Sequence, residues 1–229
     1  CIYTAPRANI HIESSDKQVT TAVFIHLGDT QIRIKPRLVF YAGGEGNQQL
    51  ARQIGISQSL MTIKPVHMLC IRHERLPLFY GHCLGAQRKQ RLTISSHQSK
   101  GTTVWYVGGE QAELGIDRDE KRQTAIILDE LKTLLPWQSL QGARCKSLLI
   151  NRIYPQERSL LSATRAHVHW QANNAFIWPT RLILAPNAGH QVLSRLQQDG
   201  RMPLHAQPAP LPLAKPASGL PAWEQLFSP

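Results

Sequence analysis

One stretch of the sequence limits the possible folds more than any other: a short apolar strand that runs into a glycine turn and then a helix. Residues 39–41 (Val-Phe-Tyr) form the strand, and the turn follows at 42–47 with the sequence Ala-Gly-Gly-Glu-Gly-Asn. Residues 48–54 have helical composition, and Gly55 ends the helix. This order is typical of one half of an α/β nucleotide-binding unit, in which backbone N–H groups approach a phosphate or ribose.

The turn departs from the dinucleotide pattern G-x-G-x-x-G, because the sixth position counted from Gly44 is Gln49. No acidic residue follows at a strand end about 20 residues further on, where that pattern expects one. A tight strand-to-helix turn without a ligand is therefore an alternative. The turn alone leaves both interpretations open.

The remaining segments predict a mixed α/β (α+β) fold. A hairpin is expected at 19–38, with its turn at Gly28 and Asp29. A long helix is expected at 117–135, capped by Asp117 with Glu120 three residues later. A second helix is expected at about 186–196. Further strands are predicted, most of them as consecutive antiparallel strands, at 66–71, 78–84, 91–96, 103–107, 145–153 and 175–178.

Composition excludes several classes of protein. A 42% share of hydrophobic residues suits a packed core, and no apolar run approaches the roughly 20 residues of a membrane span. Four widely spaced cysteines without a CxxC pair do not indicate a disulfide framework or a zinc site. We therefore expect a soluble, cytoplasmic protein. Because Cys1 takes the place of a methionine and no signal peptide follows, we expect the chain to begin inside a longer one.

The net charge of +11 raises the question of a polyanionic partner. The basic residues occur in small groups, such as those at 33–37, 72–75, 88–91 and 118–122, which suggests solvated strand ends and loops. Nucleic acid is therefore disfavoured as a partner. A non-catalytic basic module that binds nucleic acid or another anionic partner remains the alternative function.

Arg152 is the strongest candidate for a ligand contact. It sits in a mainly apolar strand, where a guanidinium is costly unless an anion satisfies its donors, although an arginine at a strand end can also reach solvent. The histidines on the predicted antiparallel strands lack metal-ligand spacing, so no metal site is predicted. Aromatic residues on these strands are more often core than ligand platform.

Four segments, taken in order, resemble the flavoprotein family that includes glycerol-3-phosphate dehydrogenase and D-amino-acid oxidase. They are 39–47 (VFYAGGEGN), 104–110 (VWYVGGE), 149–155 (LINRIYP) and 175–186 (AFIWPTRLILAP). The family's N-terminal G-x-G-x-x-G, which holds the FAD pyrophosphate, is absent from this chain and is expected upstream. The return loop has Trp178-Pro179-Thr180 in place of the family's usual glycines.

The resemblance implies a partial FAD-binding α/β domain interrupted by an antiparallel β substrate domain. The implied domains are a partial FAD-binding domain at 1–57, a substrate domain with one long helix at 58–155, a return to the FAD-binding domain at 156–200 and a Pro-rich tail at 201–229, extended or polyproline-like. FAD is the implied cofactor. Its implied contacts are Ala42, Gly43, Gly44, Gly46, Trp178, Pro179, Thr180, Leu184 and Ala185.

The implied activity is the oxidation of a small anionic hydroxy or amino compound by hydride transfer to the flavin. Arg152 is expected to grip the substrate's carboxylate or phosphate by a bidentate pair. His67, Tyr80 and His82 are expected to line the substrate side. A third possibility is a folded substrate domain that is inactive until it is joined to the rest of the protein.

Overall fold

The computed structural model describes residues 2–85, 90–156, 165–178, 181–201 and 210–228. The chain divides into two compact units. Unit 1 contains residues 1–63 and 153–217, and unit 2 contains residues 64–152 and 218–229. Two long strands, β5 (Met61–Arg72) and β9 (Arg144–Pro155), each carry one boundary between the units.

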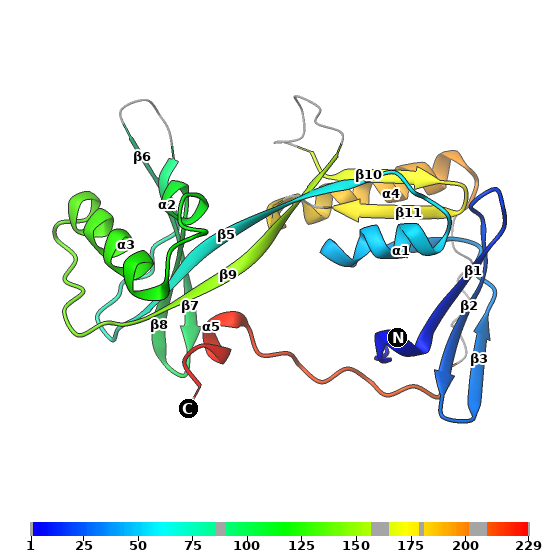
Figure 1. Ribbon diagram of the computed structural model, residues 1–229, viewed down its shortest axis with the longest axis horizontal. Coiled ribbons are helices and arrows are strands. Elements are labelled where there is room, and N and C mark those ends of the chain that lie inside the picture. Colours follow the sequence, from blue (N-terminus) through cyan, green and yellow to red (C-terminus); the bar gives the residue numbers. More distant parts are fainter. Residues whose placement is uncertain (1, 86–89, 157–164, 179–180, 202–209, 229) are drawn as a thin grey trace. The chain divides into compact units, whose positions relative to one another are not determined.

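Unit 1 holds two three-stranded sheets (Figure 1). In the first, the order is β1-β2-β3 and all pairs are antiparallel. In the second, the order is β10-β11-β4, and β11 runs parallel to β4. The strands are β1 (Ile10–Ser14), β2 (Thr20–Leu27), β3 (Thr30–Ile34), β4 (Val39–Tyr41), β10 (His167–Gln171) and β11 (Asn174–Trp178). The helices are η1 (Arg7–Asn9), η2 (Gly44–Gly46), α1 (Asn47–Gln53), η4 (Leu182–Leu184) and α4 (Ala185–Gln198).

Side chains of the β10–β11 turn connect the two sheets of unit 1. Asn173 Oδ1 accepts from the N–H of Thr20 at 2.8 Å, and Asn173 Nδ2 donates to the Thr20 carbonyl at 2.9 Å. The buried Asn174 accepts from Thr20 Oγ1 at 2.7 Å. The core lies between β4, β11 and α1, where Tyr41 and Phe176 stack with ring centroids 4.5 Å apart.

Unit 2 is built on a five-stranded antiparallel sheet with the order β6-β7-β8-β5-β9. The three strands β6 (Gly81–Leu84), β7 (Gln90–Ser99) and β8 (Thr102–Gly108) follow one another as a meander. The predicted strand at 66–71 does not pair with the next predicted strand, at 78–84. β5 pairs instead with β8, so that Cys70 lies opposite Tyr106.

Helix α3 (Glu120–Leu134) covers one face of this sheet, as Figure 1 shows. Its Ile127 and Leu131 are buried against strand residues that include Leu69 and Trp105. The prediction that Asp117 caps this helix is wrong: Asp119 is the N-cap, and its Oδ1 accepts the N–H of Arg122 at 2.7 Å. Both aspartates precede the apolar periodicity, so composition alone does not separate them.

The Pro-rich tail was predicted to be extended, but its end contains a short helix, α5 (Ala222–Gln225). Phe227 follows it and is buried in unit 2. None of the described helices is long and apolar enough to cross a membrane.

Candidate functional site

Asn47 holds the glycine turn of unit 1 together. It is buried at the start of α1, and its Oδ1 accepts the N–H of Gly43 at 2.8 Å. Its Nδ2 donates to the carbonyls of Tyr41 at 3.2 Å and Ile177 at 3.4 Å. One side chain therefore joins the turn to the carboxyl ends of β4 and β11. The Gly43 N–H is already used within the protein.

The next glycine leaves its backbone open. Gly44 has φ +57°, which favours glycine, and a Cβ placed there would meet no atom within 4 Å. The carboxyl ends of parallel strands share one edge of a sheet, where ligands of α/β proteins bind. The structure thus brings four of the predicted flavin contacts, Ala42, Gly43, Gly44 and Gly46, to one edge with Trp178, the last residue of β11.

Trp178 provides a test of whether these residues fit a large ligand. Its indole Nε1 is buried and has no hydrogen-bond partner among the described residues, and the same holds for Nε2 of His169. Buried donors of this kind normally have a partner. An unsatisfied indole N–H beside an open glycine turn fits a polar group of FAD.

The remaining predicted flavin contacts are Pro179, Thr180, Leu184 and Ala185. Pro179 and Thr180 lie outside the described residues. Leu184 precedes α4 and is half-buried, while Ala185 is exposed at the first position of the helix. No side chain caps this helix, whose second residue is Pro186. The roles predicted for these four residues stay predictions.

Arg152 lines a pocket of about 260 Å³ in unit 2, together with Gln90, Gly109, Glu110, Glu113 and Leu114. Its Nη1 lies 3.3 Å from Oε1 of Glu113, and the two side chains are 34% and 60% exposed. Such an exposed ion pair contributes little to stability. An incoming anion can therefore compete with Glu113 for the guanidinium.

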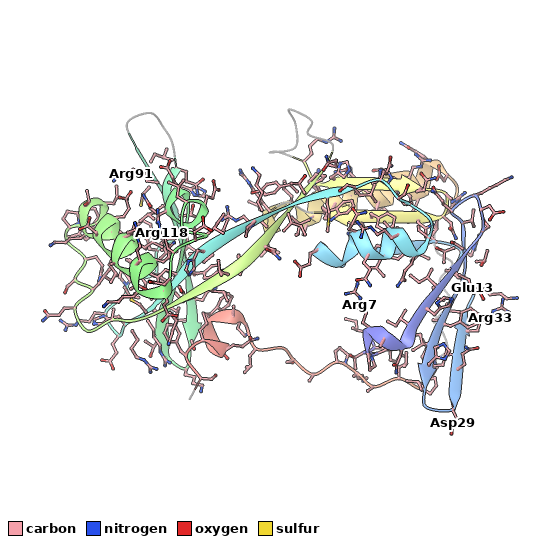
Figure 2. The ribbon with its side chains drawn as sticks, viewed as in Figure 1. Arg7, Glu13, Asp29, Arg33, Arg91 and Arg118 are labelled. Atoms are coloured by element: carbon pink, nitrogen blue, oxygen red, sulfur yellow. The ribbon has the colours of Figure 1, made fainter. Side chains whose placement is uncertain are left out.

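A buried polar network positions the wall of this pocket. The side chain of Gln123, from α3, donates to the carbonyls of His67 at 2.7 Å and Gln111 at 3.0 Å. Arg118 donates to Gln123 Oε1 at 3.0 Å and to the side chain of Gln111 at 3.3 Å. Figure 2 labels Arg118 in this region. The network fixes α2 (Glu110–Glu113), which carries the acidic partner of Arg152.

His67 lies on the side of the sheet that α3 covers. Its Nδ1 is 2.9 Å from the carbonyl of Gly115, an acceptor, so Nδ1 carries the proton. Nε2 then accepts from Ser147 Oγ at 2.8 Å. Both ring nitrogens are thus engaged within the protein, and His67 does not line the pocket of Arg152. Its predicted substrate contact stays a prediction.

The other two predicted substrate residues belong to the edge of the same sheet. Tyr80, just before β6, is 69% exposed. His82 lies on β6, and its Nδ1 is 3.0 Å from Thr93 Oγ1. Neither residue lines the pocket of Arg152. The structure therefore does not bring the four predicted substrate residues together in one pocket.

Two groups on the face opposite α3 have strongly shifted pKa values. Burial, with a smaller contribution from the nearby Cys70, raises the pKa of Tyr106 to about 12 against the opposing effect of Arg152. Burial raises the pKa of the Cys70 thiol to about 12. Both groups are therefore neutral at physiological pH, and Cys70 is a poor nucleophile in the folded chain.

A parallel strand pair with a glycine turn, joined in sequence to an antiparallel sheet, defines the mixed α/β class, so the predicted fold class is confirmed. The chain is 38% identical over 198 residues to the probable FAD-dependent oxidoreductase PA4991 of Pseudomonas aeruginosa, covering 85% of this chain and 50% of the relative. The crystal structure of the FAD-dependent oxidoreductase PA4991 from the same organism is similar with 34% identity and a TM-score of 0.84, over 99% of this chain and 61% of that chain.

A glycerol-3-phosphate dehydrogenase from Bacillus halodurans, complexed with FAD, is similar at 16% identity over 83% of this chain and 39% of that chain. Its TM-score of 0.49 is too low to identify a subfamily. No family model matches the chain. The chain is thus similar to a probable FAD-dependent oxidoreductase, and it spans about half the length of that Pseudomonas relative.

Proposed function

We propose that this chain is part of an FAD-dependent oxidoreductase that oxidises a small anionic hydroxy or amino compound. The observation that carries the proposal is the 38% identity to a probable FAD-dependent oxidoreductase over 85% of the chain. The open glycine turn and the unsatisfied Trp178 indole at one sheet edge support it. When bound, FAD supplies the acceptor for a hydride from the substrate.

In this proposal the chain's own residues have distinct tasks. Gly44 and Gly46 allow the backbone to approach the cofactor, and Trp178 donates its indole N–H to a polar group of it. Asn47 keeps the turn in place without touching the cofactor, because its polar atoms are engaged by the protein. Arg152 binds the substrate's carboxylate or phosphate after the anion displaces Glu113.

The affinity for FAD, measured by flavin fluorescence with the full-length protein, tests the proposed cofactor contacts. We expect Gly44→Ala to weaken FAD binding by about tenfold or more, because the added methyl group would keep the cofactor away from the backbone of the turn. Gly28→Ala is a matched control: it has φ +58°, it also has open space, and it lies in the β2–β3 hairpin of the same unit. Both variants carry similar backbone strain, so equal FAD affinity in the two would refute the contact.

Substrate kinetics test the second half, using small hydroxy acids, amino acids and phosphate esters and following flavin reduction. Arg152→Met should raise KM by roughly 10- to 150-fold, since it removes a charged hydrogen bond. Glu113→Gln should lower KM, because the competing carboxylate is gone. The opposite signs distinguish anion binding from a general loss of structure. A colourless full-length protein that binds polyanions in a salt-dependent way would favour the basic binding module instead.

A further inference from the structure

The C-terminal segment, residues 218–228, places aromatic rings on the face of the five-stranded sheet opposite α3. The ring of Trp223 stacks on the imidazole of His97, with centroids 3.7 Å apart and planes 15° apart. It also lies 6.3 Å from the ring of Tyr106. Phe227 is 5% exposed and packs against Cys70 and Val104. Three strands therefore contribute to one aromatic contact surface.

The surface continues toward the pocket of Arg152. Alternate residues of a strand share a face, so Val104, Tyr106 and Gly108 form one row along β8, here called the β8 row. Phe227 and Trp223 cover its first two members. At the third, Arg152 Nη2 lies 3.5 Å from the position that a Cβ of Gly108 would take. The segment thus occupies the part of the row beside Arg152.

The chain that leads to this segment is anchored separately. Residues 210–217 belong to unit 1, where the Leu211 N–H donates to Tyr3 Oη and the Ala214 carbonyl accepts from Thr4 N–H. The segment itself contains one four-residue helix, too short to be stable alone. Its order therefore depends on three apolar side chains that pack on the sheet, Trp223, Leu226 and Phe227. The burial of these side chains opposes the conformational entropy cost of ordering the segment.

We infer that the β8 row and the neighbouring His97 form a binding surface for a short aromatic peptide of the pattern Trp-x-x-Leu-Phe. Its occupant in this chain, residues 218–228, detaches and rebinds. Detachment uncovers Cys70 and Tyr106. The inference goes beyond the proposed oxidoreductase function and does not depend on it.

The rate of thiol alkylation, mapped by mass spectrometry, tests the inference on the full chain. Cys70 faces the segment, whereas Cys145 packs against the α3 side and reports on the integrity of unit 2. We expect the double variant Trp223→Ala, Phe227→Ala to label Cys70 at least about tenfold faster, with Cys145 unchanged. Trp137→Ala, a change at a tryptophan of the same unit that is 77% exposed, should change neither rate. A peptide with the sequence of residues 218–229 should restore the slow rate at Cys70.

Three results would overturn the inference. The first is an unchanged rate at Cys70, and the second is a peptide that fails to slow it. The third is an equal rise at Cys70 and Cys145, which would make the segment part of the core. If the double variant does not fold, the single change Trp223→Ala decides: faster labelling confined to Cys70 supports the inference, and an equal or absent rise contradicts it.

Discussion

Replacing Asn47 by alanine should destabilise unit 1 far more than an ordinary polar-to-alanine change. The variant loses the bonds to the Gly43 N–H at 2.8 Å and the Tyr41 carbonyl at 3.2 Å, while the third bond, to Ile177, is long at 3.4 Å and counts for little. Each unsatisfied buried group costs about 1–3 kcal/mol. Water can reach the exposed Gly43 but not the buried Tyr41 carbonyl, so we expect a loss of about 2–4 kcal/mol in unfolding free energy.

Urea unfolding, followed by far-UV circular dichroism and tryptophan fluorescence, measures this loss. Asn9→Ala is the matched control, because Asn9 lies in the same unit and makes one exposed bond, to the carbonyl of His26 at 2.9 Å. That change should cost about 0.5–1 kcal/mol. If Asn47→Ala costs no more than the control, the turn is not held by this side chain and the reasoning fails.

Three further predictions concern unit 2 and use the same unfolding assay. Gln123→Leu should lower the unfolding free energy by about 2–4 kcal/mol, because two carbonyl oxygens lose their donor; a cost under about 1 kcal/mol would contradict the network. Gly109→Ala should cost at least about 2–3 kcal/mol, since φ is +104° and a Cβ would stand 2.6 Å from a carbonyl of β7; an unchanged midpoint would contradict this. The pKa of Cys70 is raised from 9.0 to about 12, so the thiol ionises first in the unfolded chain and stability falls between pH 9 and 12, by up to about 1.4 kcal/mol per pH unit. Cys70→Ala should reduce that slope, of which the raised pKa values of Tyr106 and Cys145 supply the remainder, and a slope that persists unchanged would refute the assignment.

Elements with a local signal could be predicted from the sequence. The helix after the glycine turn is observed at Asn47–Gln53 against 48–54 expected, and the long helix at Glu120–Leu134 against 117–135. Strand pairing depends on residues far apart in sequence and could not be predicted in the same way. The pairing of β5 with β8 and the parallel pair β4–β11 join segments separated by about 35 and 135 residues, for which the sequence carries no periodic signal.

In the candidate site, too, local features could be predicted from the sequence and long-range contacts could not. The glycine turn has a local signature, and the sequence indicates it correctly as a strand-to-helix turn. Asn47, which holds the glycine turn of unit 1 in place, and Gln123, which holds the pocket wall of unit 2, were missed as determinants. Each bonds backbone atoms from other elements, and an asparagine or glutamine in a helix gives no hint of such partners. Gln123 stands four and eight residues before the apolar Ile127 and Leu131, and this helical spacing was the available signal for its burial.

The short C-terminal helix was missed for a related reason. Residues 201–229 contain seven prolines, and their composition predicts an extended peptide. Trp223 and Phe227 are four residues apart and so lie on one side of a helical turn, but two aromatic residues in a polar tail do not identify the surface that receives them. The receiving surface consists of residues between 70 and 106.

Arg152, on β9, is the last residue of unit 2 before the chain returns to unit 1. The alternation of side chains along β9 explains why Arg152 and its neighbour Ile153 contact different units. Arg152 lines the pocket of unit 2, while Ile153 packs against the core of unit 1. A strand turns successive side chains to opposite faces, so inserting one residue before Arg152 would exchange these faces. The position of the guanidinium is therefore fixed by the register of β9 against its neighbour β5.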